Sequence, residues 1–324
     1  MTGVSHLFPL HHSENLRPFD ARRDMQPVAD LIETCFANTL DADGRGFIHR
    51  MRTMAQSPGV LTWAAERVGM PLRGFVWEED GEVVGNLSMI PVTAPQGRTY
   101  LIANVAVHPD YRRHGIARTL TEMALDRMRA RGMHTAWLQA RADNPPAIAL
   151  YTGLGFSEIA RRTTWHNTAQ HTNQALSKIP TGYKVTLRRD RDWSKQRQWL
   201  KRAYPPEVIW YMPLRFELLK AGFLGMFVRM LSDRRVRQFS LRKDGRLLGV
   251  ICWQSSFSQA NRLWLAASPE YEEETAAVLL SYVQMTVTNH KIMALDYPAG
   301  HATAALEAAG FHKHQTLIWM RKEL

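Results

Sequence analysis

The sequence predicts a mixed α/β protein in which one layered fold occurs twice in tandem. FVWEEDGEVVG (75–85) and FSLRKDGRLLG (239–249) are both apolar runs around an Asp-Gly turn, the pattern of a β-hairpin. Two further pairs of segments match in the same order: VHPDY (107–111) with ASPEY (267–271), and YTGLGF (151–156) with LEAAGF (306–311). Strands and helices that alternate in this way predict a mixed sheet flanked by helices in each half.

The repeat divides the chain into two domains. We predict a first domain over residues 1–165, a linker over 166–181 and a second domain over 182–324. The proposed linker, HNTAQHTNQALSKIPT, is polar and has no periodicity. The openings of the two repeats also agree, because Arg23-Asp24 and Arg191-Asp192 each precede a helical run. A chain of 324 residues has the length expected for two domains.

The first repeat can be assigned element by element. Residues 100–107 alternate as a central strand does, and Ile116, Leu120, Met123, Ala124 and Met128 recur at the spacing of a buried helix face. The expected strands are Leu16–Phe19, the hairpin Leu72–Pro91, Tyr100–Val107, Thr135–Arg141 and Ser157–Trp165. The expected helices are Met25–Asn38, Phe47–Met54, Gly115–Arg131 and Pro145–Gly153.

The composition excludes several classes of protein. Hydrophobic residues make up 45% of the chain, but no apolar run approaches the roughly 18 residues that a membrane-spanning helix needs. The first residues lack the basic and apolar regions of a secretory signal, so we expect a cytoplasmic protein. Cys35 and Cys252 are too few for a disulfide framework or a zinc cluster, and the 13 histidines show no metal-ligand spacing. We therefore predict no metal.

The net charge of +11 is concentrated in one region. Residues 161–250 contain 20 Lys and Arg against 6 Asp and Glu. A basic region of this kind indicates either an anionic partner or a solvated face that keeps the protein soluble.

Residues 111–118, YRRHGIAR, stand between a predicted strand and a predicted helix. A helix N-terminus offers unpaired backbone N–H groups and the positive end of the helix dipole. Gly115 would allow a ligand to approach the backbone closely, and Arg112, Arg113 and Arg118 add positive charge. This combination favours a site for a diphosphate, although a basic turn with an incidental glycine would look similar.

Two motifs make the interpretation specific. Arg112-x-x-Gly115-x-Ala117 after Val105-Ala106-Val107 resembles motif A of the GCN5-related N-acetyltransferases, and LQARADNPPAIALYTGLGF (138–156) is similar to the second motif of that family. The match is closest to the branch that acetylates protein N-termini, such as the ribosomal-protein alanine acetyltransferases. The resemblance covers residues 72–165 well, and residues 16–60 only through the order of elements.

The resemblance implies an acetyl-CoA site. The backbone of Val105, Ala106 and Val107 would pair with the pantetheine arm as an added strand does. Asn144 would hydrogen-bond the cofactor, or would cap the helix that Pro145 begins, and one side chain can do both. The diphosphate would lie against Arg112 and the backbone amides of Arg113, His114, Gly115, Ile116, Ala117 and Arg118.

The resemblance also suggests which groups move protons. Tyr151 stands where the family places its general acid, and the alternative is an aromatic packing residue on an apolar helix. Gln139 stands where the N-terminal acetyltransferase branch has a glutamate, and an amide cannot accept a proton at neutral pH. An α-amine acceptor, with a pKa of about 8, would need a base less. His108 is another candidate for the base. The acidic hairpin Glu78, Glu79, Asp80 and Glu82 is a further candidate, although we interpret these residues mostly as a solvated turn.

The second repeat lacks these features. Glu272, Glu273 and Glu274 stand opposite the basic turn, where three carboxylates would repel a diphosphate. Leu306 stands opposite Tyr151 and Ala299 opposite Asn144. The plan is similar to that of the tandem mycothiol synthases, but in those the C-terminal copy is the active one.

The sequence therefore predicts an acetyl-CoA-dependent N-acetyltransferase with one site, in the first repeat. Its acceptor would be a primary amine, either a peptide N-terminus or a small amine, and a polycationic acceptor is disfavoured by the basic chain. Two alternatives stay open: a non-catalytic acyl-CoA-binding regulator, and a basic module associated with nucleic acid or the ribosome. We expect no membrane partner.

Overall fold

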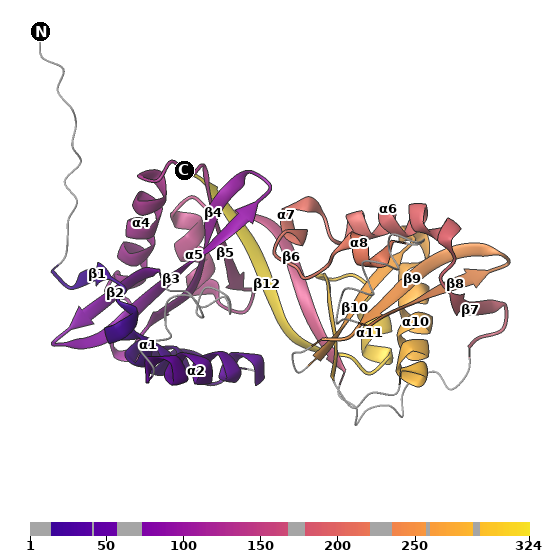
Figure 1. Cartoon of the computed structure of the whole chain (residues 1–324), viewed down its shortest axis with the longest axis horizontal. Coiled ribbons are helices and arrows are strands. Elements are labelled where there is room, and N and C mark those ends of the chain that lie inside the picture. The colour runs from indigo at the N-terminus through magenta and orange to yellow at the C-terminus, as the bar shows by residue number, and fades with distance from the viewer. Residues whose placement is uncertain are drawn as a thin grey trace, which may run out of the picture. The chain divides into compact units, whose positions relative to one another are not determined.

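The computed structural model describes residues 14–40, 42–56, 73–167, 179–220, 235–256, 260–287 and 292–324 (Figure 1). The chain forms two compact units. The first comprises Met1–Val92, Arg98–Leu138 and Lys322–Leu324, and the second comprises Thr93–Gly97 and Gln139–Arg321. Strand β5 (Thr135–Arg141) runs from the first unit into the second.

The first unit is a sheet with helices on both faces. Val76 of β2 packs against α1 and α2, while a Cβ on Gly85 of the neighbouring strand would touch Ile116 of α4. Helices α1 and α2 lie on one side of the sheet and α4 on the other (Figure 1). The strands, in their order across the sheet, are β1 (Leu16–Pro18), β2 (Gly74–Glu79), β3 (Glu82–Ala94), β4 (Gly97–Val107) and β5. The helices are α1 (Ala21–Phe36), α2 (Ala42–Ala55), the short 3₁₀ helix Pro109–Tyr111 and α4 (Ile116–Arg129).

The second unit repeats this plan. Its strands, in their order across the sheet, are β12 (His312–Glu323), β6 (Ser157–Asn167), β11 (Ile292–Pro298), β10 (Ala260–Ala267), β9 (Arg246–Gln254), β8 (Val236–Lys243) and β7 (Tyr183–Leu187). Its α-helices are α5 (Pro145–Gly153), α6 (Trp193–Ala203), α7 (Pro206–Ile209), α8 (Phe216–Leu219), α10 (Glu272–Thr286) and α11 (Thr303–Ala308), and its 3₁₀ helices are Asp190–Asp192 and Pro269–Tyr271. The predicted mixed α/β architecture and its internal repeat are confirmed.

The matched sequence landmarks have matched geometry. The Asp-Gly turns of the β2–β3 and β8–β9 hairpins both lie in the left-handed region, with φ of 50° and 85° at Asp80-Gly81 and 48° and 78° at Asp244-Gly245. This is the conformation that a tight two-residue hairpin turn requires. Both hairpins also shift register by one residue at equivalent positions, after Trp77 and after Leu241.

The core side of α4 largely follows the predicted pattern. Ile116, Leu120, Ala124 and Met128 are all at most 4% exposed. Met123, predicted on the same face, is only half-buried and lines a cavity instead. None of the helices within the described ranges is long and apolar enough to cross a membrane.

The first helix starts earlier than predicted. Helix α1 begins at Ala21, after the N-cap Asp20, so Arg23 and Asp24 lie in its first turn and do not precede it. Asp24 is fully buried and accepts hydrogen bonds from Arg17 Nη1 at 2.7 Å and from the backbone N–H of Asp20 at 2.7 Å. The Asp24 carboxylate thereby connects β1 to α1. The helical periodicity of the sequence could not predict this contact, because Arg17 lies outside the helix.

The last strand of the first repeat lies among strands of the second. Strand β6 pairs antiparallel with β11 on one side and with β12 on the other. The two compact units divide inside β5, between Leu138 and Gln139. His166 and Asn167, expected in the linker, form the end of β6. Linker residues 168–178 lie outside the described residues, and the assignment of domains 1–165 and 182–324 stays a prediction.

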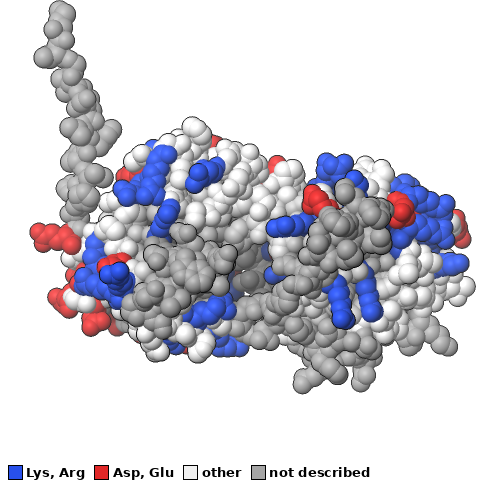
Figure 2. Space-filling model, in the orientation of Figure 1, with Lys and Arg blue, Asp and Glu red and all other residues white. Residues whose placement is uncertain are grey.

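Basic side chains of the second unit gather at its surface. Figure 2 shows Lys and Arg side chains clustered at the end that carries α6, β7 and β8. These elements lie within the 161–250 region, where the sequence has its excess of positive charge.

Gly249 of β9 should be intolerant of a side chain. A Cβ there would lie 2.4 Å from Thr275 Cγ2 and 2.7 Å from the Ala266 carbonyl oxygen. We expect Gly249→Val to lower the free energy of unfolding by about 1–3 kcal/mol, the usual cost of overpacking. Urea denaturation measures it. As a control, Gly46→Ala in α2, where a Cβ would meet only Arg50 Nη1 at 3.4 Å, should stabilise by up to about 1 kcal/mol. A Gly249→Val protein as stable as wild type would contradict this packing.

Candidate functional site

Strand β4 extends beyond the segment that pairs with β5. The parallel pairing runs from Tyr100–Ala136 to Ile102–Leu138, whereas β4 extends to Val107. Asn104 has a φ of 50°, in the left-handed region, and its carbonyl accepts a hydrogen bond from Asn86 Nδ2 at 2.7 Å. A left-handed residue inside a strand is the geometry of a β-bulge, which interrupts pairing. Residues 105–107 therefore follow a bulge-like residue, Asn104, whose conformation is suited to ending the pairing of β4 with β5.

Sequence reasoning missed this feature. Asn is among the few non-glycine residues that adopt a left-handed conformation readily, and an Asn in an otherwise apolar strand was the available signal. Of the three predicted residues that follow it, Ala106 is buried, while Val105 and Val107 are half-buried.

The basic turn forms the N-terminus of α4. Arg113 has a φ of 67° and Gly115, the N-cap, has a φ of 83°. Gly115 has no side chain to bond the first amides, and the first turn of α4 contains no acidic residue. The first N–H groups of the helix and the positive end of its dipole therefore face no carboxylate of their own turn.

The side chains of this turn add positive charge at the surface. Arg112, Arg113, His114 and Arg118 are exposed. Arg112 Nε donates to the Val107 carbonyl oxygen at 3.1 Å, and Cys35 Sγ donates to the same oxygen at 3.2 Å. Ile116, the first residue of α4, is buried, and Ala117 is half-buried. The turn is thereby attached to the end of β4 while its amides stay available to an anion.

The backbone conformation at position 115 favours glycine. A Cβ there would have no atom of the described residues within 4 Å, so none of them fills the space above it. Its φ of 83° is the reason that an L-residue is disfavoured, and the open space is compatible with the close ligand approach that the sequence suggested.

Asn144 caps α5. Its Oδ1 accepts a hydrogen bond from the backbone N–H of Ala147 at 3.2 Å, and Pro145 is the first helical residue. The capping interpretation is confirmed. The cap uses the oxygen of the side chain, so it does not compete with a donor role for the amide nitrogen.

Tyr151 lies on α5 and is 7% exposed. Its ring packs edge to face on Phe156, with centroids 6.0 Å apart, as the packing interpretation anticipated. Burial raises the pKa of the Tyr151 phenol to about 12, because an apolar surrounding disfavours the charged phenolate. The phenol is therefore protonated throughout the neutral range.

The candidate bases differ in their surroundings. Gln139 is half-buried in β5. His108 precedes the 3₁₀ helix, and its Nδ1 lies 3.7 Å from Asp110 Oδ2. Glu78 of the acidic hairpin is not a free solvated acid, because it accepts from Arg17 Nε at 2.7 Å and from Arg23 Nη2 at 2.6 Å. These arginines lower the pKa of Glu78, which makes it a poorer proton acceptor.

The predicted residues fall into two groups. Residues 105–118 form one continuous segment of the first unit, whereas Gln139, Asn144 and Tyr151 belong to the second. Within the parts of the chain that the structure describes, no group of three or more His, Cys, Asp or Glu side chains could hold a metal ion.

The equivalent helix of the second repeat begins with carboxylates that already have partners. Glu272 accepts from Tyr297 Oη and lies against His301 Nδ1, both at 2.8 Å. Glu273 accepts from the Ala305 backbone N–H at 2.9 Å, and Glu274 lies 3.4 Å from Lys243 Nζ. Leu306, opposite Tyr151, is fully buried. Negative side chains thus occupy the N-terminus of α10, which disfavours a second anion there.

Part of the chain matches a known protein family. Residues 41–156 match the profile of the acetyltransferase (GNAT) family. A ribosomal protein bS18-alanine N-acetyltransferase of Salmonella typhimurium is 44% identical over 78 residues, which are 24% of this chain and 53% of that protein. An N-alpha-acetyltransferase of Sulfurisphaera tokodaii is 35% identical over 97 residues, 26% of this chain and 56% of that protein. The chain spans about half the length of these curated relatives.

A solved structure extends the similarity to both repeats. A GCN5-related N-acetyltransferase from Sphaerobacter thermophilus superposes with a TM-score of 0.58 at 14% identity, covering 96% of each chain. At that identity the likeness concerns the fold alone. The chain therefore shares the fold of that structure along its length, and its residues 41–156 match the model of the acetyltransferase (GNAT) family.

Proposed function

We propose that the chain is an acetyl-CoA-dependent N-acetyltransferase that uses a single cofactor site, in its first repeat. The observation that carries the proposal is the N-terminus of α4, where Arg113 and Gly115 are left-handed, the first turn has no acidic residue and four basic side chains are exposed. This arrangement suits a diphosphate. The second repeat, with carboxylates at the equivalent helix, would support the fold or the acceptor and would bind no cofactor.

The residues present fit acetyl-CoA. The amides of 113–118 and the Arg112 side chain would hold the diphosphate, and the backbone of 105–107 would pair with the pantetheine amides. The Asn144 amide nitrogen would donate a hydrogen bond to the cofactor while its oxygen caps α5. Acetyl-CoA would supply an acetyl group already activated as a thioester.

Tyr151 would act as the general acid. With a pKa of about 12 it holds its proton at neutral pH and can donate it to the departing thiolate. Gln139 cannot accept a proton, so it would position a water or the acceptor. His108 is the side chain that remains as a candidate for the base. An α-amine acceptor with a pKa of about 8 is already partly neutral and needs a base less.

The acceptor would be a primary amine in the cytoplasm, either a protein N-terminus or a small amine. The names of the curated relatives, an alanine N-acetyltransferase of a ribosomal protein and an N-alpha-acetyltransferase, favour the N-terminus of a protein. The net charge of +11 favours an acceptor of neutral or negative charge.

Release of free thiol tests the proposal. Mixing the full chain with acetyl-CoA and a panel of peptides beginning with Ala, Ser, Met or Gly, together with small amines, should release CoA thiol with at least one acceptor. Assays without an acceptor give the background hydrolysis. Calorimetric binding of acetyl-CoA with no thiol release across the panel would favour a regulatory acyl-CoA-binding protein, the alternative that Gln139 motivates. Absence of binding would contradict both.

A further inference from the structure

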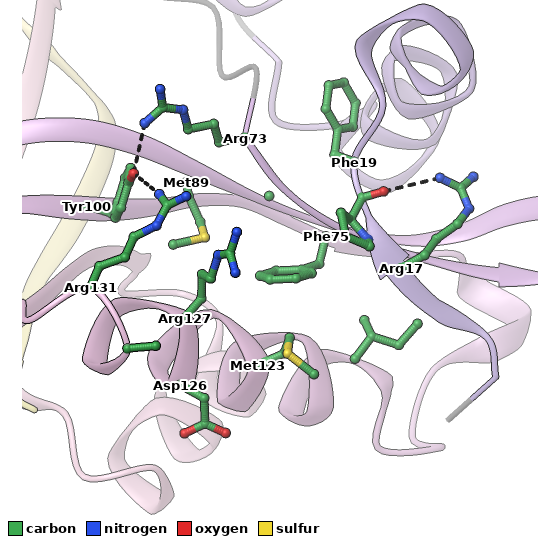
Figure 3. A pocket seen from close by; sticks show the side chains of 14 residues that line it. Arg17, Phe19, Arg73, Phe75, Met89, Tyr100, Met123, Asp126, Arg127 and Arg131 are labelled. Carbon is green, nitrogen blue, oxygen red and sulfur yellow. Dashed lines mark hydrogen bonds between the residues drawn. The ribbon is translucent and has the colours of Figure 1, made fainter. Parts of the chain in front are cut away.

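The first unit contains a cavity of about 460 Å³ that the proposed reaction does not use (Figure 3). It lies between the sheet and the C-terminal half of α4. Phe75 of β2, Met89 of β3 and Tyr100 of β4 form its sheet side, and Met123 and Arg127 of α4 close the other side.

The interior of this cavity is apolar. Phe75 and Met89 are 8% and 3% exposed, and the half-buried Met123 and Phe19 complete the wall. Such a surface receives an aliphatic or aromatic group by the hydrophobic effect.

Three guanidinium groups stand at the rim. Arg73 Nη1 and Arg131 Nη1 both donate to the Tyr100 hydroxyl oxygen, at 2.9 Å and 2.5 Å, and Arg127 lies between them and Phe75 in Figure 3. The Arg73 and Arg131 guanidinium groups thus share the Tyr100 hydroxyl oxygen as their acceptor. Tyr100 is 3% exposed, so its oxygen is held at the inner edge of the rim.

These three arginines have no carboxylate partner among the described residues. Asp126, the one acidic residue lining the cavity, accepts from Arg129 Nη1 at 2.7 Å and points away from the guanidinium groups (Figure 3). Arg17, the remaining arginine of the lining, is paired with Asp24 at 2.7 Å and Glu78 at 2.7 Å. Among the described residues, the rim therefore has three arginines without a carboxylate partner beside an apolar interior.

We propose that this cavity binds an amphiphilic anion, a carboxylate or phosphate carried on an apolar acyl or aryl group. The apolar body would lie between Phe75 and Met123, and the oxyanion would accept charge-assisted hydrogen bonds from Arg73, Arg127 and Arg131. The Tyr100 hydroxyl, which accepts two hydrogen bonds, still has its own hydrogen to donate to the same oxyanion.

The cavity is distinct from the basic turn at the other end of α4. Arg127 is eleven residues after Ile116, which corresponds to about 16 Å along the helix axis at 1.5 Å per residue. Positive side chains near a helix C-terminus also stabilise its dipole. That effect accounts for Arg127 but not for Arg73, which precedes β2 and donates a hydrogen bond to the Tyr100 hydroxyl oxygen.

Calorimetric titration of the full chain with octanoate and with phenyl phosphate tests the proposal and distinguishes the two anions. At least one should bind, and the neutral octanamide should bind at least about tenfold more weakly than octanoate if the carboxylate is the ligand. The double variant Arg73→Gln/Arg131→Gln and the single variant Arg127→Gln should each lower the affinity for the anion by about tenfold or more.

Two controls locate the binding. Arg129→Gln, on the same turn of α4 but paired with Asp126, should leave the affinity unchanged. Arg112→Gln/Arg113→Gln, at the other end of the helix, should leave it unchanged as well. Failure of both anions to bind, or equal loss of affinity in the rim variants and in either control, would overturn the proposal. Circular dichroism checks that each variant is folded.

Discussion

Replacing Arg112 and Arg113 together by glutamate is expected to lower the affinity for acetyl-CoA by at least about a hundredfold while leaving the protein folded. Both side chains are exposed at the N-terminus of α4, so their loss removes little packing. A charged hydrogen bond to a phosphate contributes about 1.5–3 kcal/mol, and 1.4 kcal/mol corresponds to a factor of ten. The introduced carboxylates would in addition repel the diphosphate.

Gly115→Val is expected to have a comparable effect for a different reason. A left-handed conformation costs an L-residue about 1–2 kcal/mol, and a branched side chain would project from the backbone toward the ligand. Gly97→Val is the matched control, because Gly97, the first residue of β4, has a φ of 114° and a Cβ there would have no atom of the described residues within 4 Å, as at Gly115. It should bind acetyl-CoA normally.

Isothermal titration of the folded variants measures both effects, and it gives the stoichiometry of the wild type. We expect one acetyl-CoA per chain, because Glu272, Glu273 and Glu274 occupy the equivalent helix of the second repeat. Unchanged affinity in both variants would remove the assignment of the site. A stoichiometry of two would show that the second repeat also binds.

Tyr151→Phe is expected to reduce kcat by about 100- to 10,000-fold, the range for loss of a general acid. The ring and its contact with Phe156 are retained, so the affinity for acetyl-CoA should stay within about twofold of wild type. Steady-state kinetics on the best acceptor of the panel and a binding titration separate the two quantities.

The pH dependence adds a second readout. Because the pKa of Tyr151 is raised to about 12, its acid form persists from pH 6 to pH 10 and cannot cause an alkaline loss of activity there. Activity should instead rise with pH as the acceptor amine loses its proton, and it should level off above the pKa of that amine. An activity that falls with an apparent pKa near 10 in wild type, but not in Tyr151→Phe, would contradict this.

Tyr204→Phe is the matched control for the loss of a buried phenol. Tyr204 is 1% exposed and its oxygen accepts a hydrogen bond from the Leu265 backbone N–H at 3.4 Å. Its replacement should lower stability and leave kcat largely unchanged. If the two variants lose stability equally and both keep full turnover, Tyr151 is a packing residue and solvent supplies the proton.

Local sequence was sufficient for the repeated units of the fold. The Asp80-Gly81 and Asp244-Gly245 turns specify their hairpins because the left-handed conformation is set by the two turn residues themselves. The glycine turns after α5 and α11 agree in the same way, since Phe156 N–H bonds to the Tyr151 carbonyl and Phe311 N–H to that of Leu306. The alternation of residues 100–107 and the helical spacing from Ile116 likewise placed β4 and α4.

The sequence by itself therefore determined the tandem fold, the basic turn at a helix N-terminus and the loss of that turn in the second repeat. Only the tertiary structure decided features that depend on partners distant in the chain. Strand β6 lies between β11 and β12, Glu272 is matched with Tyr297, and Arg73 and Arg131 meet at Tyr100. Hairpin turns and helical periodicity are set by neighbours a few residues apart, whereas strand pairing and the meeting of charged side chains depend on how the whole chain closes on itself.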